Sequence, residues 1–153
     1  MSDISTIIRS AEIGDIPQMA ELLEDLFSIE SGFSADFEKQ VCGLTMLLND
    51  PSGSSLIVVA VREDAIIGMG TVQLVVSTAE GGATGLVEDI IVQKDYRGTG
   101  IGTRILSQIH QWCKMRGATR LQLLADIDNT PACHFYSLRG WVVTNLVCLR
   151  KYL

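Results

Sequence analysis

The chain has 153 residues, of which 47% are hydrophobic, and its formal net charge is −6. This length is typical of one domain with a sizeable core, so we predict a single domain over residues 1–153 and no extended disorder. The negative charge disfavours a nucleic-acid or anionic-membrane partner, because phosphate contacts need clustered Lys and Arg. A cationic partner such as an amine is compatible with it.

The sequence carries no sign of export or of a metal centre. It begins Met-Ser-Asp-Ile-Ser-Thr, without the basic and apolar regions of a signal peptide. Its longest apolar run, residues 56–61, is far shorter than the ~20 residues that span a bilayer. The four cysteines have no C-x-x-C spacing, so neither zinc nor a disulfide framework is expected. We therefore expect a cytoplasmic protein with no metal site.

The first half of the chain predicts one short strand followed by two helices. Residues 4–9 have the pattern of the strand. A helix then begins at Asp15, with Pro17 in its first turn and Gln18 at the distance of a capping box. A second amphipathic helix is predicted from Phe37 to Leu48.

Two neighbouring strands follow, over residues 56–62 and 66–76, because both segments are rich in branched residues. Gly68 and Gly70 lie inside the second of these strands. Glycine within a strand indicates a bulge or a close approach by another group. Residues 77–85 are expected to form a flexible loop.

The second half predicts a strand at 86–92, a helix from 101 to a stop at Gly117, a strand at 121–125, a short helix from about 129, and a C-terminal hairpin of Trp141–Thr144 and Leu146–Tyr152. The order is β-α-α-β-β-β-α-β-α-β-β. This is an α/β fold with a single mixed, mostly antiparallel sheet of about seven strands flanked by about four helices.

A glycine-rich turn joins the strand at 86–92 to the following helix. Residues 97–102 read Arg-Gly-Thr-Gly-Ile-Gly. Glycine lets the backbone turn tightly and approach a ligand, and the unpaired N–H groups of a helix N-terminus favour phosphate. The turn therefore predicts a site for a phosphorylated cofactor.

Two common nucleotide motifs do not fit this turn. The dinucleotide pattern G-x-G-x-x-G needs a third glycine where the chain has Thr103, and it normally follows the first strand of a βαβ unit. The phosphate loop of NTPases needs a lysine directly after its last glycine, and none follows here. Both nucleotide interpretations are therefore weak.

The turn does fit the pattern [RQ]-x-x-G-x-[GA], carried by Arg97, Gly100 and Gly102. A second motif follows at residues 134–141, His-Phe-Tyr-Ser-Leu-Arg-Gly-Trp, and the strand before the turn reads Val-Glu-Asp-Ile-Ile-Val. Together these stretches resemble the GNAT family of N-acetyltransferases. The resemblance runs from about Ile7 to Leu153, although the first 50 residues match only in outline.

The resemblance implies a GNAT-like acyl-CoA N-acyltransferase fold, acetyl-CoA as cofactor, and acetyl transfer to a primary amine by direct attack in a ternary complex. The strand backbone at 90–92 would pair with pantetheine, and the turn would bind the pyrophosphate. The implied cofactor-binding residues are Ile90, Ile91, Val92, Arg97, Gly98, Thr99, Gly100, Ile101, Gly102, Thr103, Asn129 and Tyr136. Asn129 has the equally plain role of a helix N-cap.

The resemblance also implies two catalytic residues. Tyr136 would protonate the departing thiolate, although a tyrosine beside Phe135 also suits a core position. Glu88 would face the acceptor and take its proton, with a pKa raised by burial. Because consecutive strand residues face opposite sides of a sheet, Asp89 would point away from Glu88. Whether Glu88, Asp89 or a water is the base stays open at this point.

One alternative belongs to a different functional class: a non-catalytic acyl-CoA-binding sensor or interaction module, which would need neither Tyr136 nor the acidic pair. The acceptor itself cannot be identified from the sequence. We expect its pocket between residues 27–38, the 77–85 loop and the C-terminal hairpin. A homodimer is possible, because similar proteins are commonly dimers.

Overall fold

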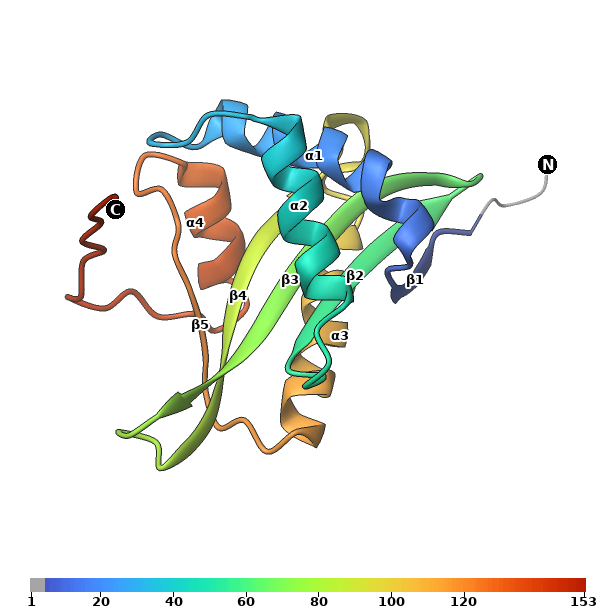
Figure 1. The fold of residues 1–153 in the computed structure, drawn as a ribbon. Helices are drawn as coiled ribbons and strands as arrows, with labels where there is room; N and C mark the ends of the chain where they lie inside the picture. The colour runs from blue at the N-terminus through green and yellow to red at the C-terminus, as the bar shows by residue number, and fades with distance from the viewer. Residues whose placement is uncertain (1–4) are drawn as a thin grey trace. The chain divides into compact units, whose positions relative to one another are not determined.

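The computed structural model describes residues 5–153. Its contacts divide the chain into two compact units, an N-terminal unit that ends at Leu123 and a C-terminal unit, Leu124–Leu153. Figure 1 shows the course of the chain through both units. The two are described separately below, and a single domain over the whole chain stays a prediction.

The N-terminal unit contains one five-stranded sheet in the order β1-β2-β3-β4-β5. The first four strands pair antiparallel, and β5 joins β4 in parallel, so the sheet is mixed and mostly antiparallel as predicted. The strands are β1 (Ile7–Ser10), β2 (Ser55–Arg62), β3 (Ala65–Ser77), β4 (Gly82–Val92) and β5 (Leu121–Leu123). The predicted first strand began at residue 4, which lies outside the described residues.

Helices cover both faces of this sheet. Helices α1 (Ile16–Ile29) and α2 (Phe37–Leu48) lie over one face, and α3 (Ile101–Met115) lies over the other (Figure 1). Two short 3-10 helices, η1 (Ile13–Asp15) and η2 (Lys94–Tyr96), precede α1 and α3. The α/β class and the helix positions follow the sequence prediction.

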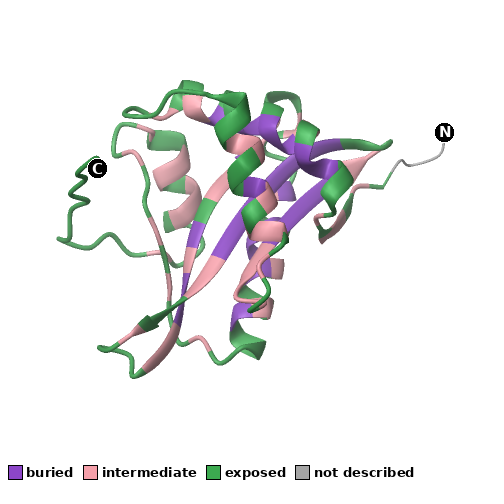
Figure 2. Ribbon diagram, in the orientation of Figure 1, coloured by how far each residue is buried: buried purple, intermediate pink, exposed green. Residues whose placement is uncertain are grey.

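The core lies on the two covered faces of the sheet, as the buried residues in Figure 2 show. On one face, leucines of α1 and α2 pack with Val59, Met69 and Ile91 of the strands. On the other face, Ile105 and Ile109 of α3 are fully buried. Burying side chains of this size contributes about 1.5–3 kcal/mol each, so both helical layers hold the sheet in place.

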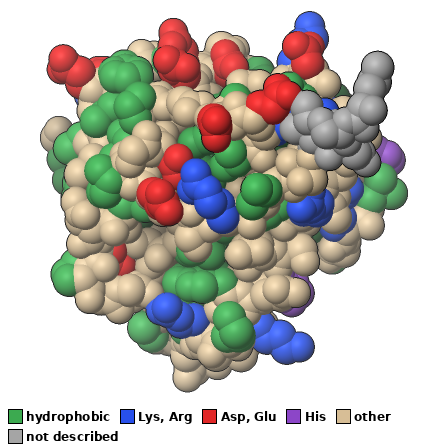
Figure 3. Space-filling view, turned by 90° about the vertical axis from the view of Figure 1, so that its right-hand side faces the viewer, with side chains coloured by type: hydrophobic (Ala, Val, Ile, Leu, Met, Phe, Trp, Pro, Cys, Tyr) green, Lys and Arg blue, Asp and Glu red, His purple; other side chains and the backbone are tan. Residues whose placement is uncertain are grey.

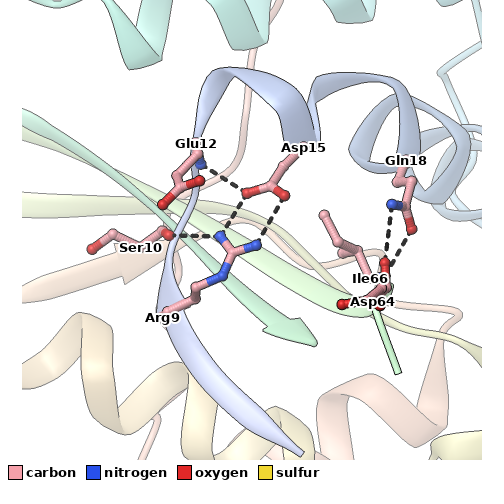
Figure 4. A network of polar contacts seen from close by, with 7 residues as sticks. All are labelled: Arg9, Ser10, Glu12, Asp15, Gln18, Asp64 and Ile66. Atoms are coloured by element: carbon pink, nitrogen blue, oxygen red, sulfur yellow. Dashed lines mark hydrogen bonds and ion pairs between the residues drawn. The ribbon is translucent and has the colours of Figure 1, made fainter. Parts of the chain in front are cut away.

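The start of α1 is held by contacts that the sequence did not predict (Figure 4). The Asp15 carboxylate accepts two hydrogen bonds from the Arg9 guanidinium, at 2.7 and 3.0 Å, and one from the Glu12 backbone N–H, at 2.8 Å. The Gln18 side chain accepts a hydrogen bond from Ile66 N at 2.8 Å instead of closing a capping box with Asp15. The predicted capping box is therefore wrong, and both side chains connect α1 to the sheet.

Acid should remove the stabilisation that the Arg9–Asp15 pair provides. The hydrogen bonds from Arg9 hold the pKa of the Asp15 carboxyl below its usual value. This contribution is therefore complete above the pKa of an unfolded Asp and is lost as the pH falls through the lower, folded value. We expect Asp15→Asn to cost about 1 kcal/mol near neutral pH, since Arg9 is partly exposed. Urea unfolding curves of the two proteins should converge in acid, and a constant difference at every pH would contradict the assignment.

The loop predicted at residues 77–85 is mostly strand. β3 continues to Ser77 and β4 starts at Gly82, in a regular antiparallel register that leaves only residues 78–81 as a turn. Backbone pairing with a neighbouring strand outweighs the turn-like composition of this stretch. The prediction of a flexible loop over residues 77–85 is therefore wrong.

The C-terminal unit contains one helix, α4 (Thr130–Ser137), and no strand among its described residues. Residues 124–125, predicted to extend the fifth strand, are also irregular. The predicted C-terminal hairpin is absent, and Val143 and Leu149 within it are each 90% exposed. High β-propensity does not form a strand unless its backbone and one face find partners. Residues 5–153 therefore form five strands in place of the approximately seven predicted.

Candidate functional site

Strand β4 contains a bulge at the acidic pair. Thr71 of β3 lies opposite Glu88 and Met69 lies opposite Ile91, so Gly70 faces two residues of β4 where a regular ladder has one. The first of the two, Asp89, has a φ of 55°. Positive φ is uncommon outside glycine, although Asp and Asn tolerate it better than most residues. The bulge indicated by the glycines of β3 is therefore confirmed.

The bulge turns the Asp89 carboxylate toward Thr71. The Thr71 hydroxyl donates a hydrogen bond to Asp89 Oδ2 at 3.4 Å, and Thr71 itself is buried. Burial, together with the negative charges of Glu88 and Glu30, raises the pKa of Asp89 to about 7, against the smaller opposing effect of the Thr71 hydrogen bond. Asp89 can therefore gain and lose a proton near neutral pH, as a general base does.

Glu88 lies in a different environment from Asp89, because its side chain is exposed to solvent. It lies opposite Thr71 in register, and Thr71 is also the residue that donates to Asp89. The two carboxylates are thus not separated in the way that regular strand alternation predicts. The left-handed conformation of Asp89 interrupts the alternation.

Beyond the acidic pair, one edge of β4 is left without a strand partner. The parallel pairing with β5 consists of three residue pairs and ends at Val87 opposite Leu123. Within the described N-terminal unit, residues 88–92 therefore pair only with β3. An unpaired strand edge offers backbone N–H and C=O groups to an extended ligand.

The glycine-rich turn leads from this edge into α3. Gly100 is the N-cap of α3 with a φ of 86°, and Gly98 has a φ of 75°. A Cβ atom added at either position would meet no other atom within 4 Å, so the space beside the turn is open. Gly100, the N-cap residue, brings no capping side chain to the N-terminus of α3. A helix N-terminus beside open space favours an anion such as a pyrophosphate.

Side chains of the turn hold it in place from within. Arg97 Nε donates to the Val92 carbonyl at 2.8 Å, which ties the turn to the end of β4. The Thr99 hydroxyl donates to the Tyr96 carbonyl. Ile101 is buried and anchors the start of α3 to the core. The Arg97 side chain thus acts on the backbone of the turn.

Two further predicted site residues belong to the C-terminal unit. Asn129 is the N-cap of α4, and its side chain accepts a hydrogen bond from Ala132 N at 3.2 Å, so its capping role is confirmed. Tyr136 lies on α4 with its ring edge-to-face against Phe135, at 5.2 Å between centroids, and against Trp141, at 5.8 Å. Tyr136 is therefore held between two aromatic rings.

The structure thus places most of the predicted site residues on one continuous stretch of the N-terminal unit. Glu88, the strand edge at 90–92 and the turn at 97–103 follow one another there, whereas Asn129 and Tyr136 lie in the C-terminal unit. Sequence reasoning missed Thr71 and Glu30, which act on Asp89 from β3 and from the end of α1. Neither carries a local signal, because both meet Asp89 only through tertiary contacts.

The surface around α1 is acidic. In Figure 3 acidic side chains gather along the upper part of one face of the molecule. A hollow of about 290 Å³ beside α1 has Glu21, Glu24 and Asp25 among its lining residues. Such a surface attracts cations and repels anions.

No group of three or more His, Cys, Asp and Glu side chains among residues 5–153 is arranged to hold a metal ion. In the same part of the chain, none of the helices combines the length and the apolar character needed to cross a membrane.

Comparisons with known proteins place this chain in a family. The model of the acetyltransferase (GNAT) family matches residues 16–141. Streptothricin acetyltransferase A of Bacillus subtilis is 40% identical over 58 residues, which are 38% of this chain and 34% of that protein. The chain therefore aligns with about a third of the length of this curated relative.

Solved structures share the fold over nearly the whole chain. A glucosamine-6-phosphate N-acetyltransferase from Arabidopsis thaliana has a TM-score of 0.75 at 24% identity. The superposed region covers 97% of this chain and 98% of that enzyme's chain. A predicted acetyltransferase from Clostridium acetobutylicum, solved with acetyl-CoA, has a TM-score of 0.78 at 18% identity and covers 96% of each chain. The match of the family model across most of the sequence is decisive: this chain belongs to the acetyltransferase (GNAT) family.

Proposed function

We propose that the protein is an acetyl-CoA-dependent N-acetyltransferase that acts on a primary amine by direct attack in a ternary complex. One observation carries the proposal: the unpaired edge of β4, the open turn before α3 and a carboxyl group that titrates near neutrality follow one another in a single segment. A strand edge and a helix N-terminus suit an extended, phosphorylated ligand, and the carboxyl group suits proton transfer.

The residues present fit acetyl-CoA. In this proposal the backbone of residues 90–92 binds the pantetheine arm. The turn at 97–103 binds the pyrophosphate through N–H groups that follow Arg97, whose own N–H donates to the Lys94 carbonyl. Open space beside Gly98 and Gly100 supports this assignment, because the backbone can approach the phosphates there. Asn129 is proposed to contact the cofactor in addition to capping α4. When bound, acetyl-CoA supplies an acetyl group activated as a thioester.

The acidic pair is proposed to receive the proton of the acceptor. An amine must lose its ammonium proton before its lone pair can attack, and a carboxylate near pKa 7 is well matched to that task. This favours Asp89 over the exposed Glu88 as the proton acceptor. Glu88 would then add negative charge that attracts the cationic acceptor.

We infer a small cationic amine as the acceptor. The carboxylates of Glu88, Asp89 and Glu30 and the acidic surface around α1 support this choice. The names of the relatives suggest which compounds to test first: streptothricin, glucosamine-6-phosphate and aminoglycosides. Polyamines and peptides complete the panel.

Two measurements test the proposed function. Calorimetry should show one CoA or acetyl-CoA site per chain and no comparable binding of ATP. Release of CoA thiol should then depend on one class of amine in the panel. Binding of acetyl-CoA without turnover of any amine would favour the acyl-CoA-binding module, and binding of ATP alone would refute both.

Tyr136 is proposed as the general acid that protonates the departing sulfur. We expect Tyr136→Phe to lower kcat about 10²-fold, at the lower end of general acid catalysis, because only a proton donor is removed. The Kd for CoA should stay nearly unchanged, since the aromatic packing against Phe135 and Trp141 is kept. Phe135→Leu is the control for packing alone. Unchanged kcat in the Phe variant would mean that water supplies the proton.

A further inference from the structure

Gly70 of β3 lies directly opposite the two bulged residues, Asp89 and Ile90. Its own φ is not positive, so the backbone at this position accepts any residue. A Cβ atom built there would lie 2.5 Å from Ile90 Cδ1 and 2.9 Å from Ile105 Cγ2. Real Cβ atoms do not approach other atoms so closely, so a glycine is required here by space and not by backbone conformation.

Ile90 cannot easily give way to a side chain at position 70. Ile105 and Ile109 of α3 are both fully buried on the same side of the sheet, and Ile109 Cδ1 would lie only 3.1 Å from the added atom. The Ile90 side chain therefore occupies the space that Gly70 leaves empty. This contact accounts for the position of the second bulged residue.

The position of Ile90 decides where Asp89 points. Without the bulge, the ladder that pairs Thr71 with Glu88 would put Asp89 opposite Gly70, on the face covered by the isoleucines of α3. With the bulge, Ile90 takes that place, and the Asp89 carboxylate instead meets the Thr71 hydroxyl. Asp89 must adopt a positive φ for this, which costs free energy that the surrounding packing has to offset.

We propose that Gly70 is a positioning residue for the proton-accepting carboxylate: its missing side chain gives Ile90 its place against α3, and this contact holds Asp89 beside Thr71. The inference rests on the proposed function of the acidic pair. The charged groups that act on Asp89 are Glu88 of β4 and Glu30 at the end of α1, and neither is moved directly by a change at position 70.

Gly70→Ala tests the proposal. The added methyl group should push Ile90 away from the sheet and open the bulge to solvent, so the apparent pKa of Asp89 falls from about 7 toward the ordinary carboxyl range. We expect kcat to fall about 10-fold or more, because small displacements of a reacting group are costly. Carbon-13 NMR titration of the Asp89 carboxyl, assigned with Asp89→Asn, reads the pKa without turnover.

The same crowding elsewhere in the sheet provides a matched control. A Cβ atom at Gly85 of β4 would lie 2.7 Å from Leu121 Cδ2 and 3.0 Å from Cys113 Sγ. Gly85→Ala should therefore lower the Tm as Gly70→Ala does but leave the Asp89 titration where it is. Equal shifts of the titration in both variants would show a general loosening of the sheet and would overturn the proposal.

A second substitution should restore the site. Ile90→Val removes the Cδ1 atom that lies nearest to the added methyl group. The double variant Gly70→Ala/Ile90→Val should recover most of the Asp89 pKa and of kcat relative to Ile90→Val alone. If Gly70→Ala does not fold, the double variant Gly70→Ala/Ile90→Val carries the test by itself, and failure of that protein to fold or to show the raised pKa of Asp89 contradicts the proposal. A different result is that the wild type shows the raised pKa of Asp89 and the double variant recovers it, while neither protein acetylates any amine. That result would uphold the positioning role of Gly70 and refute the proposed function.

Discussion

Gly100→Asp is expected to abolish CoA binding. Gly100 begins α3 in the left-handed conformation with open space around it, where the proposed pyrophosphate meets the first N–H groups of the helix. A carboxylate at this position would occupy the anion site and repel the phosphates at a distance of a few ångströms. We expect the Kd to rise at least ~100-fold, which corresponds to about 2.7 kcal/mol, measured by calorimetry at constant salt.

Two control variants separate charge from backbone strain. Gly100→Asn has nearly the same shape and tolerates positive φ, so it should weaken binding far less than the charged variant. Gly117→Asp introduces the same residue at a φ of 79° after the other end of α3, where a Cβ is equally unhindered. It should leave the Kd unchanged. Equal losses for Asn and Asp at position 100 would mean that shape, and not anion binding, governs this turn.

Asp89→Asn is expected to cause the largest loss of turnover. If Asp89 accepts the amine proton, kcat/KM of the wild type should rise as the pH passes through about 7, because only the ionised carboxylate is a base. The Asn variant should lose ~10²–10⁴-fold near neutral pH. The deficit should shrink in acid, where the wild-type carboxyl is protonated, and in alkali, where solution already supplies neutral amine.

Glu88→Gln is the matched comparison, since it removes the neighbouring charge from the exposed position of the pair. It should lower the pKa of Asp89, because the negative charge of Glu88 helps to raise it. The acid limb of the profile should therefore move to lower pH while most of the rate is kept. A flattened profile in Glu88→Gln and a normal one in Asp89→Asn would assign the base to Glu88 instead.

Asp89→Asn should also raise the stability of the fold. A carboxyl whose folded pKa lies above its unfolded value favours folding less as the pH rises through the folded value, because the ionised form is poorly solvated in the structure. Asp89→Asn should therefore increase the Tm more at pH 8 than at pH 5, in thermal scans without ligand. A gain in stability with a loss of turnover is expected for a strained residue in a catalytic site.

The sequence by itself determined the α/β class, the order of the elements through α3 and the turn before that helix. These features depend on local signals: hydrophobic periodicity, clustered branched residues and glycines at fixed offsets between a strand and a helix. Two ordered motifs indicated the family, and the match of the family model over residues 16–141 confirms that assignment. The prediction of a C-terminal hairpin was wrong. Its apolar residues have high β-propensity, but a strand also requires a backbone partner.

Only the tertiary structure decided which of the two carboxylates is less exposed and where it points. The sequence shows Glu88 and Asp89 as two adjacent acids, and strand alternation assigns them to opposite faces. The bulge cancels that alternation, and it depends on a glycine 19 positions earlier in the chain and on the isoleucines of α3. Packing between distant segments sets both the burial and the pKa of Asp89, so no local pattern around residues 88–89 could predict them.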